Sequence, residues 1–408
     1  MDFEPTDRSR DYQERVRAFI RAHVLPIEHE HHAELEAARN GGDWRRWRVP
    51  ERIEQLKARA RADGLWNLFL PDERLGAGLR VAEYAPVAEE MGHSLLAPEL
   101  FNCSAPDTGN MELLWKYGSP EQRARWLEPL LAGEIRSVFC MTEPAVASSD
   151  ATNMQATAVL DGGEVVVDGH KWWSSGLGDP RARVAIVMAR TPDDGKDRHH
   201  QHTMVLVPLD VPGVEIRRMQ SVFGGWDEPY GHGEVRFERV RVPAGSVIGD
   251  TGMGFEIAQG RLGPGRIHHC MRCIGAAERA LELAVARGTS RVAFGRPLLD
   301  LGGNRERIAE ARLAIDQARL LTLYAAWKMD RVGAPGAMQE ISAIKVVAPR
   351  VLQQVVDIAM QLHGGMGISG DTPLTGFFAQ ARALRIADGP DEVHLATIAR
   401  LELKRQLH

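Results

Sequence analysis

The chain has 408 residues, of which 26% are charged and 44% hydrophobic, and its formal net charge at pH 7 is −5. This length can bury a large core and predicts two or three domains. Because acidic residues outnumber lysine and arginine together, no basic surface for nucleic acid is expected, and four cysteines are too few for a disulfide framework. A signal or transit pattern and a run of eighteen apolar residues are both missing, so we expect a cytoplasmic protein without a membrane span.

Helical periodicity runs through the first third of the chain, from residue 8 to about 134. Apolar side chains such as Val16 and Phe19 recur on one face before Pro26 interrupts the pattern. Further helical runs are expected at about 51–63, 79–95 and 120–132. We therefore predict an N-terminal helical domain over residues 1–135.

The middle third changes to short strands. Residues 164–167 and 170–173 flank Asp168-Gly169, a pair that suits the type I′ turn of a two-residue β-hairpin. Further strands are expected at 183–189, 203–209 and 234–242. The pattern predicts a central antiparallel β domain over residues 136–250.

The helical period returns after Gly252. Four or five helices are expected, at 255–287, 305–332, 337–362, 374–384 and 393–407. They are long enough for a four-helix-type bundle over residues 251–408, which completes an α+β fold of helices, antiparallel sheet and helical bundle. Cys270 and Cys273 have the spacing of a zinc half-site, but no second pair follows, so no metal is expected.

A tight corner is predicted between the last two helices. The Gly389-Pro390 pair ends one helix, and Pro390 can occupy the first turn of the next, where its missing N–H costs nothing. Such a corner can point the Asp388 carboxylate into an apolar cavity, where desolvation would raise its pKa and suit it to proton abstraction. The alternative is that Asp388 or Asp391 caps the last helix.

Two segments of the β domain have the composition of a cofactor site. Residues 139–150 combine small residues, hydroxyls and a proline, which can bring hydrogen-bond donors close to an electron-poor ring or a phosphate. Residues 172–176 place two tryptophans beside two hydroxyls, fit for stacking on a heteroaromatic ring. A capped turn and core tryptophans are the respective alternatives.

Two segments of the last domain could contact a nucleotide. Arg291 offers a guanidinium suited to a pyrophosphate, with Phe294 close by, although an exposed arginine at a helix end is equally ordinary. Residues 361–367 hold three glycines that permit close approach of a ligand or another backbone. They do not form the dinucleotide-binding GxGxxG pattern.

Taken together and in this order, these segments resemble the acyl-CoA dehydrogenase family. The resemblance covers nearly the whole chain, through Thr-Glu-Pro, Lys-x-Trp, Arg-x-x-Phe-Gly, Gln-x-x-Gly-Gly-x-Gly and an acidic residue followed by glycine. It implies an FAD enzyme that oxidises an acyl-CoA to a trans-2-enoyl-CoA, by α-proton abstraction and β-hydride transfer to flavin N5. It also implies an electron-transfer flavoprotein as acceptor, and a homodimer or homotetramer.

The resemblance assigns roles position by position. Cofactor contacts fall on Phe139, Met141, Thr142, Ser148, Ser149, Trp173, Ser174, Ser175, Arg291, Phe294, Gln361, Gly364, Gly365, Pro390 and Glu392. Substrate contacts fall on Ser149, Arg266 and Gly389. In the family, the positions of Arg291, Phe294, Gln361 and Gly365 serve the FAD of a neighbouring subunit.

The sequence departs from the family pattern at the catalytic base. Asp388 falls where most members carry a glutamate, so the base would be one methylene shorter; the other family position for a glutamate is Gly265 here. The 142–150 loop is one residue longer than the common form, so Ser148 and Ser149 both stay candidates for the substrate side. The branch with Ala-Asp-Gly-Pro-Asp-Glu-Val-His has been linked to long, branched or 4-hydroxylated acyl-CoAs.

Two other functions fit the same residues. One is a flavin acyl-CoA oxidase or monooxygenase that uses O₂ directly, which predicts rapid peroxide formation without an added acceptor. The other is a non-catalytic acyl-CoA-binding homologue, which predicts a colourless protein. The acyl chain itself is not determined by these motifs.

Overall fold

The computed structural model of the chain describes residues 4–39, 42–191, 195 and 197–407. The chain divides into two compact units. The helical unit comprises Met1–His32, Leu56–Phe101 and Gly263–His408, and the sheet unit comprises Ala33–Gln55 and Asn102–Leu262. The division into three domains, with boundaries after residues 135 and 250, stays a prediction.

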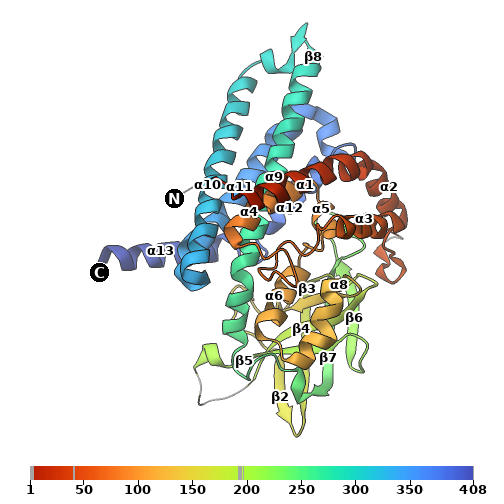
Figure 1. Ribbon diagram of the computed structural model, residues 1–408, viewed down its shortest axis with the longest axis vertical. Coiled ribbons are helices and arrows are strands. Elements are labelled where there is room, and N and C mark those ends of the chain that lie inside the picture. The colour runs from red at the N-terminus through yellow and green to blue at the C-terminus, as the bar shows by residue number, and fades with distance from the viewer. Residues whose placement is uncertain (1–3, 40–41, 192–194, 196, 408) are drawn as a thin grey trace. The chain divides into compact units, whose positions relative to one another are not determined.

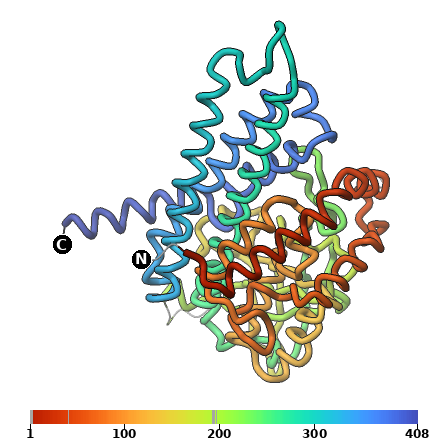
Figure 2. Tube along the Cα trace, turned by 45° about the horizontal axis from the view of Figure 1, so that its top comes forward, coloured from red at the N-terminus to blue at the C-terminus, as the bar shows by residue number. Residues whose placement is uncertain are grey.

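The helical unit is built on the long helices α9 (Gly254–Ser290), α10 (Asn304–Gly336) and α11 (Met338–His363), which lie side by side in Figures 1 and 2. The part of α9 before Gly263 belongs to the sheet unit. Helix α10 is interrupted at Gly333, whose φ of 70° is not helical, so the helix end predicted at residue 332 coincides with a real break.

Shorter elements complete the helical unit, and α11 packs against both α12 and α13. These elements are α1 (Asp7–Phe19), α4 (Val81–Met91), α5 (Ala97–Leu100), the strands β8 (Val292–Ala293) and β9 (Arg296–Pro297), α12 (Leu374–Leu384) and α13 (Asp391–Leu407). Helices α2 (Glu28–Ala38) and α3 (Glu51–Ala62) have residues in both units. The helices predicted for the last third of the chain are confirmed.

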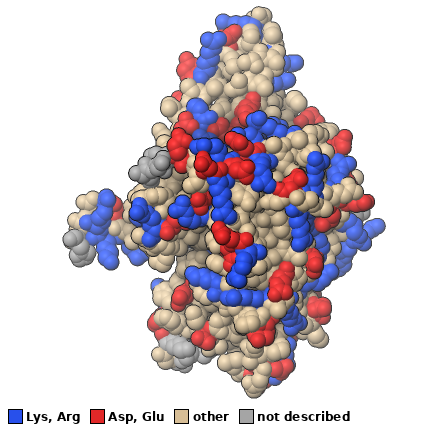
Figure 3. All heavy atoms as spheres, in the orientation of Figure 1, with Lys and Arg blue, Asp and Glu red and all other residues tan. Residues whose placement is uncertain are grey.

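Acidic and basic side chains are interspersed over the face shown in Figure 3. Within the described ranges, no helix is long and apolar enough to cross a membrane, and no group of three or more His, Cys, Asp or Glu residues could hold a metal ion. Cys270 and Cys273 are buried on α9.

The sheet unit contains a mixed sheet, whose seven described strands follow the order β1-β4-β2-β3-β7-β6 with β5 paired to β4. The strands are β1 (Arg136–Cys140), β2 (Thr157–Asp161), β3 (Glu164–Ser175), β4 (Ala182–Arg190), β5 (His202–Pro208), β6 (Val214–Gln220) and β7 (His232–Pro243). Antiparallel pairing dominates, but β1 and β4 run parallel. The helices α6 (Asp107–Tyr117), α7 (Pro120–Gln122) and α8 (Glu128–Ala132) belong to the same unit.

The predicted hairpin turn at Asp168-Gly169 is wrong. Strand β3 runs without a turn through both residues, and the β2–β3 hairpin closes instead where Asp161 pairs with Glu164. A β-carbon on Gly169 would lie 2.3 Å from the Ala156 side chain. Glycine is therefore present at 169 because a neighbouring segment packs against the strand, a reason that an Asp-Gly pair does not reveal.

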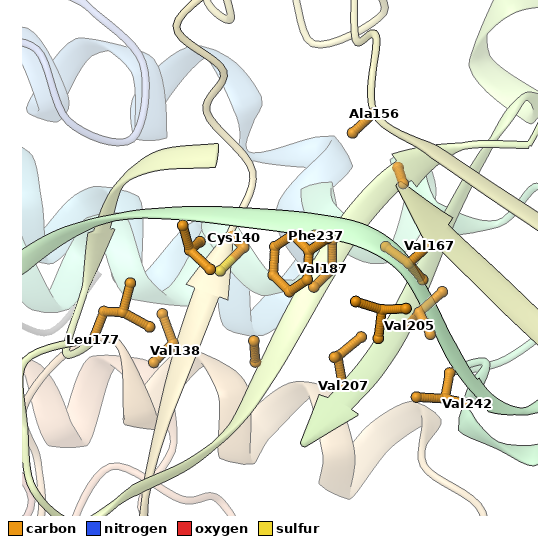
Figure 4. Close-up of a cluster of buried hydrophobic side chains, with 14 of the residues drawn as sticks. Val138, Cys140, Ala156, Val167, Leu177, Val187, Val205, Val207, Phe237 and Val242 are labelled. Atoms are coloured by element: carbon orange, nitrogen blue, oxygen red, sulfur yellow. The ribbon is translucent and has the colours of Figure 1, made fainter. Parts of the chain in front are cut away.

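The core of the sheet unit forms between the sheet and the segments that cover it. Figure 4 shows Val138 and Cys140 of β1, Val187 of β4, Val205 of β5 and Phe237 of β7 pointing into one cluster. All of these side chains are almost completely buried. Close packing of aliphatic side chains from neighbouring strands fixes the positions of the strand ends, from which the candidate cofactor residues extend.

Candidate active site

Asp388 lies on the corner between α12 and α13 of the helical unit, as the sequence predicted. Its backbone is left-handed, with φ of 56°, a conformation that aspartate tolerates better than most residues. Gly389 follows with φ of 101°, and a β-carbon there would lie 2.9 Å from His394 Nε2. The corner therefore requires glycine at 389, both for its backbone angle and for space.

Donors from three helices hold the main chain of this corner. Arg266 of α9 donates from Nε and Nη2 to the Asp388 carbonyl oxygen at 3.2 and 3.0 Å, and His394 Nε2 of α13 lies 3.3 Å from the same oxygen. Lys345 Nζ of α11 donates to the carbonyl oxygens of Leu384 and, at 3.5 Å, Gly389. The carboxylate-bearing residue is thus fixed through its backbone, and its side chain stays 28% exposed.

Arg266, predicted to contact the substrate, is almost fully buried against this corner. Burial lowers the pKa of its guanidinium, and the Asp388 carboxylate acts in the opposite direction. Burial likewise lowers the pKa of Lys345, with Cys270 and Asp388 opposing the shift. Burial removes both cations from water, and the carbonyl oxygens of the corner accept hydrogen bonds from them in place of water.

Asp391 takes the first position of α13, which leaves the corner itself to Asp388. Its carboxylate is buried and paired with Arg350 at 3.0 Å and Arg385 at 2.9 Å. The Pro390 carbonyl accepts from the backbone N–H groups of Val393 and His394, so Pro390 directly precedes the helix. Glu392 is exposed in the first turn.

The buried His394 is expected to make the protein less stable in mild acid. Burial, with Arg266 and Lys345 nearby, lowers the pKa of His394 from 6.5 to about 4. The unfolded chain takes up a proton as the pH falls below 6.5, whereas the folded chain does so only near 4. The contribution of neutral His394 to the free energy of unfolding is therefore fully present above pH 6.5. It decreases as the pH falls from 6.5 toward 4, by about 3 kcal/mol at most.

Urea unfolding of the wild type and of His394→Gln, at about pH 7.5 and about pH 5, measures this effect. The variant cannot titrate at residue 394, so its stability should decrease less in acid than that of the wild type. An equal acid loss in both proteins contradicts a neutral His394 in the folded state.

A buried ion pair of the sheet unit anchors the segment that carries Thr142. Lys171 of β3 is fully buried, and its Nζ donates to Glu143 Oε1 and to the Met141 carbonyl oxygen, both at 2.8 Å. The Glu143 carboxylate also accepts the backbone N–H groups of Gln155 and Ala156. Thr142 itself is half-buried between these anchored neighbours.

The loop after Thr142 distinguishes the two candidate serines. Ser148 is half-buried, and its Oγ accepts the Glu143 backbone N–H at 2.9 Å. Ser149 is exposed. Of the two serines, Ser149 is therefore the more accessible, and the choice between them for the substrate side stays a prediction.

The end of β3 presents one tryptophan to solvent. The pairing of β3 with β7 shifts register between Lys171 and Ser174, and Trp173 within this bulge has φ of 51° and is 42% exposed. Ser175 Oγ lies 2.9 Å from His232 Nδ1, and the His232 ring packs beside the Trp173 indole with 5.9 Å between ring centres. A bulge that re-aims a side chain is common beside functional sites, and this one leaves an indole face available for a flat ring.

Three other cofactor candidates of the sheet unit are less exposed than Trp173. Ser174 is fully buried with its hydroxyl against the Cys140 thiol, so a cofactor could reach it only through its backbone. Phe139 of β1 lies under the Arg261 guanidinium, 3.9 Å from the ring centre. Met141 follows β1 and is half-buried.

The predicted nucleotide-contacting residues lie on the helical unit. Phe294 and Gly295 form the two-residue turn of the β8–β9 hairpin, both with positive φ, at the end of the long helices in Figure 1. Phe294 is 95% exposed and Arg291, just before β8, is also exposed. The hairpin tip therefore leaves both the ring and the guanidinium accessible.

The glycine cluster after α11 is open in the same way. Gln361 is exposed in the last turn of the helix, and β-carbons built on Gly364 and Gly365 would meet no atom within 4 Å. A flat ligand or a neighbouring chain could therefore approach this backbone directly. Within the sheet unit, the exposed Trp173 face and the half-buried Thr142 fit a flat ring such as the flavin of FAD.

Three family models match the chain in the order that the motifs predicted. They describe the N-terminal, middle and C-terminal domains of acyl-CoA dehydrogenases and match residues 6–134, 138–240 and 252–403. The chain belongs to the acyl-CoA dehydrogenase family. The resemblance seen in the sequence and the predicted fold class are thereby confirmed.

Several acyl-CoA dehydrogenase relatives are similar over nearly the whole chain. FadE2 of Mycobacterium tuberculosis, a provisionally assigned acyl-CoA dehydrogenase, is 52% identical over 100% of this chain and 98% of its own length. Acyl-CoA dehydrogenase family member 11 of Rattus norvegicus is 51% identical over 99% of this chain, which spans about half (51%) of that relative. A solved structure from Mycobacterium abscessus, also provisionally assigned, is 58% identical with a TM-score of 0.95, covering 99% of this chain and 100% of that one.

Sequence reasoning missed the residues that support this acyl-CoA dehydrogenase corner. Lys345 is a single polar residue within an apolar helical run, and His269 directly follows another histidine, His268, so neither position differs clearly from a buried structural residue. Helical spacing was the available signal. His269 lies one turn after Gly265, the other position at which the family carries its catalytic glutamate, and residues one turn apart share a face of the helix.

Proposed function

We propose that this protein is an FAD-dependent acyl-CoA dehydrogenase that converts an acyl-CoA thioester to a trans-2-enoyl-CoA. The observation that carries the proposal is the Asp388 corner, in which Arg266, Lys345 and His394 bind main-chain oxygens while the carboxylate stays partly exposed. A base must keep its acceptor oxygen available, and fixing it through the backbone achieves this.

In this proposal Asp388 removes the α-proton of the thioester. FAD, when bound, supplies the acceptor for the β-hydride. Thr142, Phe139 and Met141 line the flavin, while the exposed indole of Trp173 packs on its ring and the hydroxyl of Ser175 hydrogen-bonds to it. Ser149, Arg266 and Gly389 are assigned to the substrate.

The exposed residues Arg291, Phe294, Gln361, Gly364 and Gly365 would serve the FAD of a second subunit. Their exposure within one chain leaves them accessible to a second subunit, as a homodimer or homotetramer would require. Pro390 and Glu392, at the start of α13, are assigned to the subunit's own FAD. An electron-transfer flavoprotein is proposed as the electron acceptor, and the cytoplasm as the compartment.

Anaerobic titration with acyl-CoAs that differ in length, branching and 4-hydroxylation tests the activity and identifies the substrate class. The purified protein should be yellow, and the accepted acyl-CoA should bleach the flavin absorbance. In the same assay with air and no added acceptor, peroxide should form slowly. Fast peroxide formation would instead indicate an oxidase or monooxygenase, and a colourless protein would indicate a non-catalytic acyl-CoA-binding homologue.

A further inference from the structure

A histidine side chain lies against the carboxylate of the Asp388 corner. His269 is on α9, three residues after Arg266, and its Nε2 is 3.5 Å from Asp388 Oδ2. The side chain is 18% exposed. Both residues belong to the helical unit, so this contact lies within a single compact body.

The other ring nitrogen of His269 contacts an arginine. Arg272, three residues later on α9, lies with its Nη2 at 3.2 Å from His269 Nδ1. A guanidinium can only donate, so Nδ1 must offer its lone pair. A proton on Nδ1 would point at the guanidinium, and the ring must therefore carry its proton on Nε2, the nitrogen nearest the Asp388 carboxylate.

Three other side chains at the corner contact its backbone. Arg266, Lys345 and His394 bind carbonyl oxygens and so position the main chain. His269 Nε2 instead lies beside the carboxylate itself, at Oδ2. A group that holds one carboxylate oxygen determines where the other oxygen points.

We propose that His269, with its tautomer set by Arg272, is a positioning residue that holds Asp388 Oδ2 through Nε2–H and so orients the carboxylate for removal of the substrate's α-proton. The proposal rests on the proposed function of Asp388 as the base. It also explains how a base one methylene shorter than glutamate can be oriented: the imidazole reaches the carboxylate from α9. His269 does not receive the proton, because Nε2 already carries one and Nδ1 faces a cation.

The variants His269→Leu and His269→Gln test this role in the FAD-loaded protein. Leucine removes the donor, whereas the glutamine amide can place an N–H near the position of Nε2. The leucine variant should lose about 100-fold in kcat with little change in KM, as expected for a misaligned reactive group. Glutamine should recover most of the loss. A glutamine variant as slow as leucine, or a leucine variant as fast as the wild type, overturns the proposal.

Two further measurements separate positioning from a structural role. The exchange of α-deuterium from a labelled acyl-CoA into water reports proton abstraction directly and should follow the same order of variants. ¹⁵N NMR of histidine-labelled wild type, assigned with His269→Gln, should show the neutral Nε2–H form, and the Nδ1–H form overturns the proposal. If His269→Leu does not fold, His269→Asn, with a shorter reach, replaces it.

Asp388→Asn, measured in parallel, distinguishes failure of this inference from failure of the proposed function. If Asp388→Asn still turns over, Asp388 is not the base and the proposed function fails with it. If Asp388→Asn is inactive while His269→Leu is normal, Asp388 keeps its assigned role and only the positioning role of His269 is rejected.

Discussion

Replacing Asp388 by asparagine should leave a yellow protein whose flavin is no longer bleached by acyl-CoA. The amide cannot accept the α-proton, and loss of a general base typically costs 10²- to 10⁴-fold in rate. Asparagine tolerates the left-handed conformation that the corner requires (φ of 56°), and the contacts from Arg266 and Lys345 are to backbone oxygens. The variant should therefore fold and load FAD normally, so that the lost activity reports the carboxylate alone.

Two further variants control this experiment. Asp371→Asn makes the same chemical change at an exposed position just before α12 and should keep wild-type bleaching. Asp388→Glu restores a carboxylate with the length that most of the family uses and should retain measurable activity. Turnover in Asp388→Asn at the wild-type rate would rule out Asp388 as the base.

Replacing Lys171 by methionine should strongly destabilise the sheet unit. The change leaves Glu143 as an unpaired carboxylate in a site where it is 3% exposed, and breaking a buried ion pair in this way costs about 3–5 kcal/mol. The segment around Thr142 would also lose the hydrogen bond from Lys171 Nζ to the Met141 carbonyl oxygen. Urea unfolding measures the stability loss, and the flavin content of the purified variant reports whether the Thr142 segment still binds.

The double variant Lys171→Met with Glu143→Gln is the matched control, because it removes both charges together. It should recover part of the stability lost in the single variant. Arg241→Gln removes a surface partner of Asp161 and Glu164 and should leave the urea midpoint unchanged. A Lys171→Met midpoint that matches Arg241→Gln would show that the buried pair does not anchor the segment.

Local patterns were sufficient for most of the regular structure. The helices of the last third follow from apolar spacing over long runs, and the strands predicted at 183–189, 203–209 and 234–242 correspond to β4, β5 and β7. The Asp168-Gly169 pair failed because its glycine serves packing against Ala156 rather than a turn. Two residues carry too little information to distinguish these causes, which depend on Ala156, a residue outside the pair and earlier in the chain.

The candidate site shows the same limit. The motifs located Thr142, Trp173 and Asp388, since each lies in a distinctive stretch of sequence. They assigned Arg266 to the substrate, which stays a prediction, but did not indicate that its guanidinium donates to the Asp388 carbonyl oxygen. They did not indicate that Lys345 and His269 belong to the same corner.

By itself the sequence determined the family, the order of helices and strands, and the residue types available for chemistry, because periodicity and short motifs are local properties of the chain. Only the tertiary structure decided what surrounds Asp388. Its neighbours come from α9, α11 and α13, with Arg266 and His394 more than a hundred residues apart along the chain, and they meet only because the helices of this unit pack together. Which backbone oxygen a buried cation binds, and which nitrogen of His269 faces the carboxylate, are consequences of that packing.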